Sequence, residues 1–377
     1  MTERTPSEQL WLRVTGSLNR DRYDLAVRAA DGFPSELRLA GTPLLAPPAW
    51  RVPAPVALES IRLDFRPDTP PPDVPDVAAL APYALPERAD GTRYQRYSDV
   101  VAALAAPTVF ENRPTYRLVE ADLADAGADA GAGPRLAFSR GRFFWGIDDT
   151  GPAGLEYAAA ECGVAHGHAY RAALGGPACL ARRSATMATS ALTLRYDQVT
   201  GTATFPLHYR DPGQVSHAGG LYQVIPVGVF QPSGEAPWNE GNDFSLWRGL
   251  LREYAEELLG ADEDHGSEHV PIDYAAWPLA RAMTSALADG RIQAWCLGLG
   301  ADPLTLALDL LAVVVIDAPL YDELFGEMVD ANAEGRVIKP RPFDERSVTE
   351  LVADAPLQAA AAALLRLALA HRDALLT

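Results

Sequence analysis

Three glutamates in the second half of the chain, Glu253, Glu256 and Glu257, have the spacing of a helix face that can bind a metal ion. Because an α-helix repeats every 3.6 residues, side chains at positions i, i+3 and i+4 share one face. Carboxylates gathered in this way repel one another unless a positive charge lies between them. A hard divalent cation, Mg²⁺ or Mn²⁺, takes oxygen ligands and would satisfy this arrangement. The spacing therefore indicates a cation site on this helix.

The same pattern also occurs on helices that only face solvent. There, Arg252 would pair with Glu256 one turn later, an interaction worth about 0.2–0.5 kcal/mol. The surrounding sequence favours the cation site, because a strand-like run over residues 221–225 precedes the helix. Gly228 lies in the loop that follows this run, and Gly260 follows the helix as a C-terminal glycine does. A strand, a loop and an acidic helix in this order place the carboxylates beside a loop that can hold a ligand.

The run Arg252-Glu253-Tyr254-Ala255-Glu256-Glu257 resembles the core of the Nudix box, whose pattern is G-x5-E-x7-R-E-U-x-E-E-x-G-U with U bulky and apolar. All six residues of this core match, with Tyr254 at the apolar position. The resemblance extends over about residues 186–350. It implies an α/β fold of the α+β type, a Nudix-like α/β/α sandwich around a mixed sheet. A separate mixed α/β domain would precede it.

The box departs from the Nudix pattern at two places. Gly260 stands one residue later than the pattern requires. Upstream, Phe244 occupies the position of the loop glutamate, and Asp243 is its neighbour. The loop over residues 228–242 is therefore expanded, and the helix ligands match the family better than the loop ligand does.

The resemblance implies Mg²⁺-dependent (or Mn²⁺-dependent) hydrolysis of a nucleoside diphosphate linked to another moiety. Glu253, Glu256 and Glu257 would be the metal ligands and catalytic residues, and Arg252 would orient a glutamate. Glu334, or alternatively Glu327, would supply a base from a later loop. These residues are assigned by the resemblance alone.

Residues of the expanded loop are candidates for contact with the substrate. We expect Gly228, Phe230 and Asp243 to contribute to substrate binding. The aromatic ring of Phe230 can stack on a nucleobase or fill the core, and the same choice applies to Trp238 and Phe244. Both alternatives are compatible with the sequence.

A second function is compatible with the same motif, namely a Nudix-like module that binds a nucleotide-type ligand without turnover and acts as a sensor or regulator. The displaced loop acid and the lengthened box favour this alternative, whereas the presence of all three glutamates favours hydrolysis. A sensor that controls transcription normally carries a DNA-binding helix pair, and no basic helix-turn-helix is recognisable at the N-terminus. A partner protein would then have to supply one.

Composition narrows the classes of partner. The 377 residues include 50 Asp and Glu against 32 Lys and Arg, a formal net charge of −18. Such a surface argues against binding to nucleic acid or to an anionic membrane. Three cysteines without a paired spacing favour a reducing compartment. The start of the chain does not resemble a signal peptide, and no apolar stretch of about 18 residues occurs. We therefore expect a cytoplasmic protein with a small-molecule ligand.

Other candidate sites are weaker. Cys162, His166 and His168 lie close together, but no fourth ligand stands at a recognised zinc spacing, and packing explains these residues equally well. His265 and His269 do not follow the H-E-x-x-H order and are expected in a solvated loop. No nucleophile motif of the G-x-S-x-G type occurs.

The sequence predicts an N-terminal α/β domain over residues 1–185, the Nudix-like domain over 186–350 and a C-terminal helix within 351–377. That helix, over 355–376, would pack across the domain or against a second subunit, so a homodimer is a possible assembly. In the N-terminal part we expect a proline-rich segment over 43–86 and a mobile Ala/Asp/Gly loop over 121–134. The other expected helices cover 7–30, 94–104, 155–162, 274–288 and 321–332. The expected strands cover 56–65, 116–119, 135–138, 143–147, 191–196, 202–209, 291–297 and 306–316.

Overall fold

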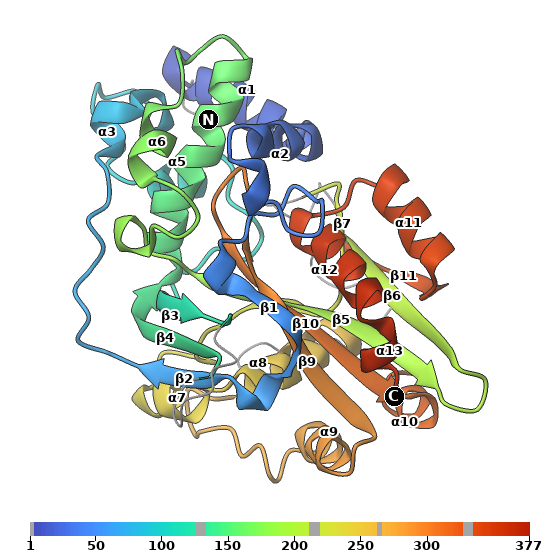
Figure 1. Cartoon of the computed structure of the whole chain (residues 1–377). Coiled ribbons are helices and arrows are strands. Elements are labelled where there is room, and N and C mark those ends of the chain that lie inside the picture. The colour runs from blue at the N-terminus through green and yellow to red at the C-terminus, as the bar shows by residue number, and fades with distance from the viewer. Residues whose placement is uncertain (1–3, 125–132, 211–218, 262–265, 327–334) are drawn as a thin grey trace.

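Figure 1 shows the computed structural model of the chain, which describes residues 4–124, 133–210, 219–261, 266–326 and 335–377. The described residues form a mixed α/β structure with two β-sheets. One sheet is built mainly from the second half of the chain. The other belongs to the first half.

The larger sheet has eight strands within the described ranges, in the order β1-β9-β10-β5-β6-β11, with β7 beside β6 and β8 beside β5. β10 runs parallel to β5 and antiparallel to β9, so the sheet is mixed. Along β10 nearly every residue is buried, as expected for a strand covered on both faces. The strands are β1 (Arg51–Ala57), β5 (Met187–Asp197), β6 (Thr202–Arg210), β7 (Tyr222–Gln223), β8 (Val227–Val229), β9 (Ile292–Ala301), β10 (Leu308–Asp317) and β11 (Gly335–Pro342).

Helices cover both faces of the larger sheet. In Figure 1, α12 lies in front of the sheet and contacts β5, β9 and β10, whereas α8 lies behind it and contacts β5 and β8. None of the helices in the described ranges combines the length and the apolar character that crossing a membrane requires. The helices of this half are α7 (Pro237–Asn242), α8 (Leu246–Glu253), the π-helical turn η6 (Tyr254–Leu258), α9 (Pro278–Ala288), α10 (Ala318–Phe325), α11 (Glu345–Asp354), α12 (Ala359–Ala370) and α13 (Arg372–Leu375).

The first half of the chain contributes the smaller sheet and a separate helical layer. In the sheet, β4 (Arg135–Arg142) is parallel to β2 (Arg62–Phe65) and antiparallel to β3 (Pro114–Asp122). The helical layer has its own hydrophobic core. Its helices, with the short 3₁₀ turns of this half, are α1 (Pro6–Arg20), α2 (Arg22–Asp31), η1 (Ser35–Leu37), η2 (Pro48–Trp50), η3 (Leu58–Ser60), α3 (Val77–Leu80), η4 (Pro82–Ala84), α4 (Tyr97–Leu104), α5 (Phe143–Glu161), α6 (Ala169–Leu174) and η5 (Leu180–Arg182).

The two halves share one sheet and one core. β1, from the proline-rich segment, pairs with β9 and forms an edge of the larger sheet. The largest hydrophobic cluster contains side chains from both sides of residue 185. A boundary drawn at residue 185 therefore crosses continuous packing.

Several expected elements differ from the structure. Residues 143–147 were expected as a strand but begin helix α5, because a short apolar run does not distinguish a strand from a buried helix. The run 221–225 contains only the two-residue strand β7. The expected helix over 355–376 begins at Ala359 and breaks at His371 into α12 and α13, and it packs across its own sheet. Most of the expected loop over 121–134 lies outside the described residues.

The strands expected over 191–196 and 202–209 are present as β5 and β6, which form a hairpin. Its strands pair antiparallel, and the turn contains Gly201 with a φ of 67°.

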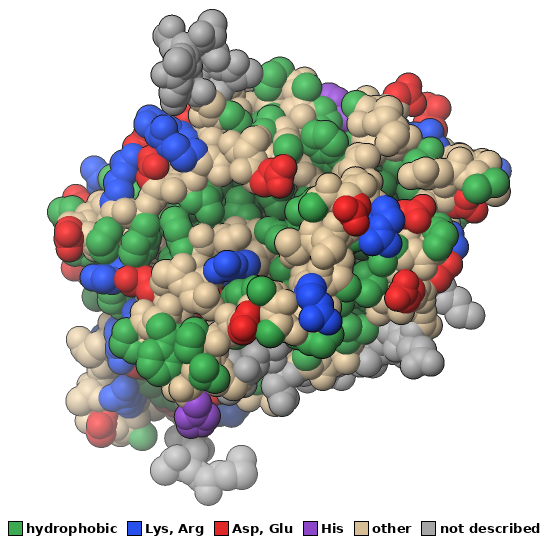
Figure 2. Space-filling view, turned by 90° about the horizontal axis from the view of Figure 1, so that it is seen from below, with side chains coloured by type: hydrophobic (Ala, Val, Ile, Leu, Met, Phe, Trp, Pro, Cys, Tyr) green, Lys and Arg blue, Asp and Glu red, His purple; other side chains and the backbone are tan. Residues whose placement is uncertain are grey.

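The face shown in Figure 2 carries acidic and basic side chains interspersed with apolar ones.

Candidate functional site

The three glutamates lie where helix α8 passes into the π turn η6. Helix α8 begins after Ser245, whose hydroxyl accepts a hydrogen bond from the Arg248 N–H. Glu253 is the last residue of α8, and the other two glutamates lie in the π turn. The segment ends at Gly260, as the prediction of a C-terminal glycine requires. The φ of this residue is 69°, a conformation that glycine adopts readily.

The π turn contains one residue more than an α-helical turn would. The sequence motif places its glycine at position 259, whereas the chain has Leu259 there and Gly260 next. The extra residue is accommodated inside the helix, and the N–H of Ala261 still bonds to the carbonyl of Ala255 at 3.0 Å. The helix therefore closes in the normal way despite its additional residue.

Glu253 and Glu257 contact neighbouring residues of strand β8, but the three carboxylates differ in which of them line a cavity. The Glu253 carboxyl group occupies the space that a Cβ atom on Gly228 of strand β8 would need. Glu257 is only 4% exposed, and its Oε1 accepts a hydrogen bond from the Val227 N–H at 3.1 Å. Glu253 and Glu256 line a small cavity of about 10 Å³, room for roughly one water molecule or ion. Glu257 does not line this cavity.

The remaining cavity wall comes from Arg252 and from the segment Gln231, Pro232 and Ser233. The Arg252 guanidinium donates to the carbonyl of Gln231 at 2.5 Å. It is almost fully buried and therefore needs a compensating charge.

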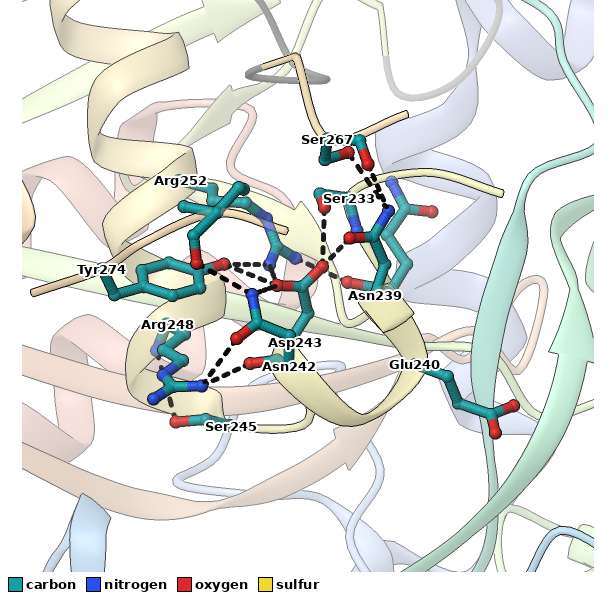
Figure 3. A network of polar contacts seen from close by, with 12 residues as sticks. Ser233, Asn239, Glu240, Asn242, Asp243, Ser245, Arg248, Arg252, Ser267 and Tyr274 are labelled. Carbon is teal, nitrogen blue, oxygen red and sulfur yellow. Dashed lines mark hydrogen bonds and ion pairs between the residues drawn. The ribbon is translucent and has the colours of Figure 1, made fainter. Parts of the chain in front are cut away.

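Asp243 supplies that charge (Figure 3). Its carboxylate lies 3.4 Å from Arg252, and both side chains are at most 6% exposed. Tyr274 bridges the pair, because its hydroxyl accepts from Arg252 and donates to Asp243, both at 2.8 Å. The second carboxylate oxygen accepts from the N–H and the hydroxyl of Ser233, at 2.8 and 2.6 Å. The loop and the helix are thus joined by one buried polar network.

The electrostatics of this network keep the Arg252 guanidinium charged and the Tyr274 phenol neutral. Burial alone would lower the pKa of Arg252, but Tyr274, Asp243 and Glu253 raise it above the ordinary value. Burial raises the pKa of Tyr274, although Arg252 acts in the opposite direction. The phenol therefore remains protonated and can donate to Asp243.

A further layer holds Tyr274 in place. The Arg248 guanidinium lies over the Tyr274 ring, 4.8 Å from its centroid, and donates to the carbonyl of Asn242 at 2.5 Å. The Asn242 amide donates to the carbonyl of Ile272 at 3.0 Å. Sequence reasoning did not select Tyr274, Gln231 or Ser233, because each joins the site through the fold and none belongs to a local motif.

Two residues expected to contact substrate are inside the protein. Phe230 is 2% exposed and packs among aromatic rings, which favours the core-filling alternative. Asp243 is fully buried and its carboxylate bonds to other residues of the network, so its role is to hold those residues in place. Gly228 faces Glu253 directly. Glu334 and Glu327 lie outside the described residues.

The residues present fit a two-carboxylate Mg²⁺ site. Among the described residues no three His, Cys, Asp or Glu side chains are grouped closely enough to hold a metal together. Mg²⁺ commonly binds through one or two carboxylates and completes its coordination with water and phosphate oxygens. Glu253 and Glu256 at a cavity of ionic size satisfy that requirement. Of the residues considered for a zinc site in the N-terminal half, His168 packs against an aromatic ring. Its imidazole stacks on Tyr157, with the ring centroids 4.8 Å apart.

Comparisons with known proteins give no family for this chain. No model of a protein family matches it, and a search of curated proteins found no match.

Proposed function

We propose that the chain binds a phosphoanhydride-containing ligand through Mg²⁺ or Mn²⁺ held by Glu253 and Glu256. The reaction we propose is the Nudix-type hydrolysis of a nucleoside diphosphate linked to another moiety. The observation that carries the proposal is that both carboxylates line one cavity beside the buried Arg252. The Nudix-like sandwich belongs to the same proposal and is supported by helices on both faces of a mixed sheet.

The ion pair of Arg252 with Asp243 strengthens the resemblance where the sequence departs from the motif. Phe244 occupies the position of the loop glutamate and packs among aromatic rings. Asp243, one residue earlier, supplies the carboxylate that reaches the motif arginine. The carboxylate that the motif places at position 244 is thereby replaced by the carboxylate of the preceding residue, which reaches the same arginine.

The residues of the chain divide the chemistry between them. A bound Mg²⁺ supplies neutralisation of phosphate oxygens and acidification of a bound water. Glu253 and Glu256 hold the cation, and Gly228 leaves room for the Glu253 carboxyl group. Arg252 keeps the Gln231 carbonyl and thus the cavity wall in place. Glu334 remains a proposed base from the later loop.

Binding without turnover is the second candidate function, and the position of Glu257 favours it. This carboxylate accepts the Val227 N–H and is almost completely buried. Only two of the three motif glutamates therefore face the cavity. A module of this kind would hold a nucleotide-type ligand through one cation and would act as a sensor or regulator.

Metal binding and turnover can be tested with the full-length protein. Mn²⁺ binding is measured by electron paramagnetic resonance for the wild type and for Glu253→Gln, Glu256→Gln and Glu257→Gln. We expect the first two variants to lose at least about tenfold in affinity, a loss that mutation of residues behind a metal ligand already causes. Glu257→Gln should retain binding, because its amide oxygen can still accept the Val227 N–H. Absence of Mn²⁺ binding by the wild type would overturn the site.

Turnover is tested with a panel of dinucleotides, sugar nucleotides and nucleoside triphosphates in the presence of Mg²⁺ or Mn²⁺. Release of a mononucleotide from one of them, lost in Glu256→Gln, supports the hydrolase. Cation-dependent binding of a panel member without product supports the second function. Glu350→Gln is the control for loss of an exposed carboxylate, because Glu350 only pairs with Arg346 on the surface.

A further inference from the structure

Tyr116, on strand β3 of the first half, contacts both ends of the segment over residues 230–240. Its N–H donates to the carbonyl of Phe230 at 3.2 Å, and its hydroxyl donates to the carbonyl of Glu240 at 2.8 Å. Its side chain is 1% exposed. One residue of the smaller sheet therefore fixes the start and the end of the loop that leads to the candidate site.

The cross-strand neighbour of Tyr116 reinforces this attachment. Arg140 on β4 pairs in register with Tyr116. Its guanidinium bonds to both carboxylate oxygens of Glu240, at 2.6 and 2.9 Å. Figure 3 shows the Glu240 side chain directed away from Asp243, toward the teal strands of the smaller sheet. Two residues later on β4, Arg142 forms an ion pair with Glu235.

Aromatic packing holds the segment from its two flanks. The Phe230 ring lies 4.7 Å from Tyr116 and 5.1 Å from Phe138, measured between centroids. The Phe244 ring lies 5.0 Å from Tyr116 and 5.8 Å from Phe138. Phe230 and Phe244 both belong to the second half of the chain, and their ring partners belong to the smaller sheet. Burial of these rings makes the attachment a stable part of the core.

The same segment forms one wall of the cavity that contains Glu253 and Glu256. Gln231 and Ser233 line the cavity. The Gln231 carbonyl accepts from Arg252, and Ser233 donates to Asp243, three residues after Glu240. A displacement of the segment would move this wall relative to the two carboxylates.

We infer that Tyr116 is a positioning residue for the cation site, with Arg140 acting beside it. The smaller sheet thus fixes the cavity wall opposite the motif helix, which gives the first half of the chain a role in ligand binding. This inference rests on the proposed binding of a cation by Glu253 and Glu256.

The test uses Tyr116→Phe in the full-length protein. This variant keeps the ring in the aromatic cluster and keeps the backbone N–H, and it removes only the hydroxyl that donates to Glu240. The dissociation constant of Mn²⁺ is measured by electron paramagnetic resonance, well below the melting temperature. We expect it to rise by about threefold to tenfold, the range that follows from loss of one buried hydrogen bond. A purely structural role would lower the melting temperature and leave the dissociation constant unchanged.

Arg140→Gln provides a second variant, with Arg96→Gln as its matched control. Arg140 and Glu240 are 60% and 33% exposed, and so are Arg96 and Asp99. Both arginines bind their partner through two nitrogens, but Asp99 lies in helix α4, in the helical layer. We expect weaker Mn²⁺ binding in Arg140→Gln and unchanged binding in Arg96→Gln.

The outcomes separate this inference from the function on which it rests. If the wild type binds Mn²⁺, Glu256→Gln loses it, and Tyr116→Phe and Arg140→Gln bind like the wild type, the positioning role is overturned and the cation site stands. If the wild type does not bind Mn²⁺, both fail together. Should Tyr116→Phe not fold, Arg140→Gln decides alone: unchanged affinity then contradicts the inference.

Discussion

The carboxyl group of Glu253 lies over the α-carbon of Gly228, in the space that any side chain at position 228 would occupy. This glycine does not have a positive φ, so its backbone conformation does not require glycine. Glycine is required here because the Glu253 carboxyl group lies close to the backbone of strand β8. The contact links the short strand to the motif helix at the position where a cation is proposed to bind.

Gly228→Ala is therefore expected to displace the Glu253 carboxyl group while leaving the sheet intact. Mn²⁺ affinity should fall by at least about tenfold, since one of two proposed carboxylate ligands loses its orientation. Gly241→Ala is the matched control, because it lies in helix α7 of the same region and a Cβ there meets nothing within 4 Å. Calorimetric titration with Mn²⁺ measures both variants, and equal affinities would contradict a role for this contact.

Asp243→Asn is expected to destabilise the protein strongly. The substitution leaves the Arg252 guanidinium buried without its counter-charge, and breaking a buried ion pair costs about 3–5 kcal/mol. The free energy of unfolding in urea measures the effect. Glu350→Gln breaks an exposed pair instead and should cost at most about 1 kcal/mol. A similar small loss in both variants would show that the network contributes little to stability.

A buried aspartate away from the site predicts a pH dependence of stability. Asp309, on β10, accepts a hydrogen bond from the Ser190 hydroxyl at 2.8 Å. Burial raises its pKa from 3.8 to about 7, although Ser190 opposes the shift. Between these pH values the folded protein holds a proton that the unfolded chain has released. The contribution of Asp309 to stability should therefore fall as the pH rises from about 4 to about 7 and then level off.

Asp309→Asn removes this contribution because an amide does not titrate. Above pH 7 the variant should be more stable than the wild type, by an amount on the order of a few kcal/mol, and the difference should shrink toward pH 4. Asp149, whose pKa burial raises to about 6, contributes with the same sign in both proteins and cancels in the comparison. Urea unfolding across the pH range measures the difference, with Asp354→Asn as an exposed control. A gap that does not change with pH would contradict the prediction.

Local features of the motif helix could be predicted from the sequence. The spacing of Glu253, Glu256 and Glu257 and the glycine at position 260 depend only on neighbouring residues, and the structure has a helix that ends at this glycine. The direction of each carboxylate was not predictable, because Glu257 is turned to β8 by a backbone N–H from 30 positions earlier. Side-chain direction depends on such tertiary contacts.

The features of the site and the fold that could not be predicted depend on contacts between segments that are distant in the sequence. Tyr274 joins the site from 22 residues beyond Arg252, and no spacing rule connects the two. β1 contains Pro53 and Pro55, which suggest an irregular segment, yet it pairs at the edge of the larger sheet, where missing N–H groups are tolerated. Pairing with β9, from the other half of the chain, thus makes a strand of a segment whose prolines suggest irregular structure.

The π turn over Tyr254–Leu258 contains one residue more than an α-helical turn would, and the helix still ends at a glycine with a positive φ. An additional residue of this kind does not change how the helix ends. It shifts every position from Leu258 onward by one relative to a sequence pattern with fixed spacing. Two helices that differ only by such a turn would therefore share their capping residues but not the spacing between them.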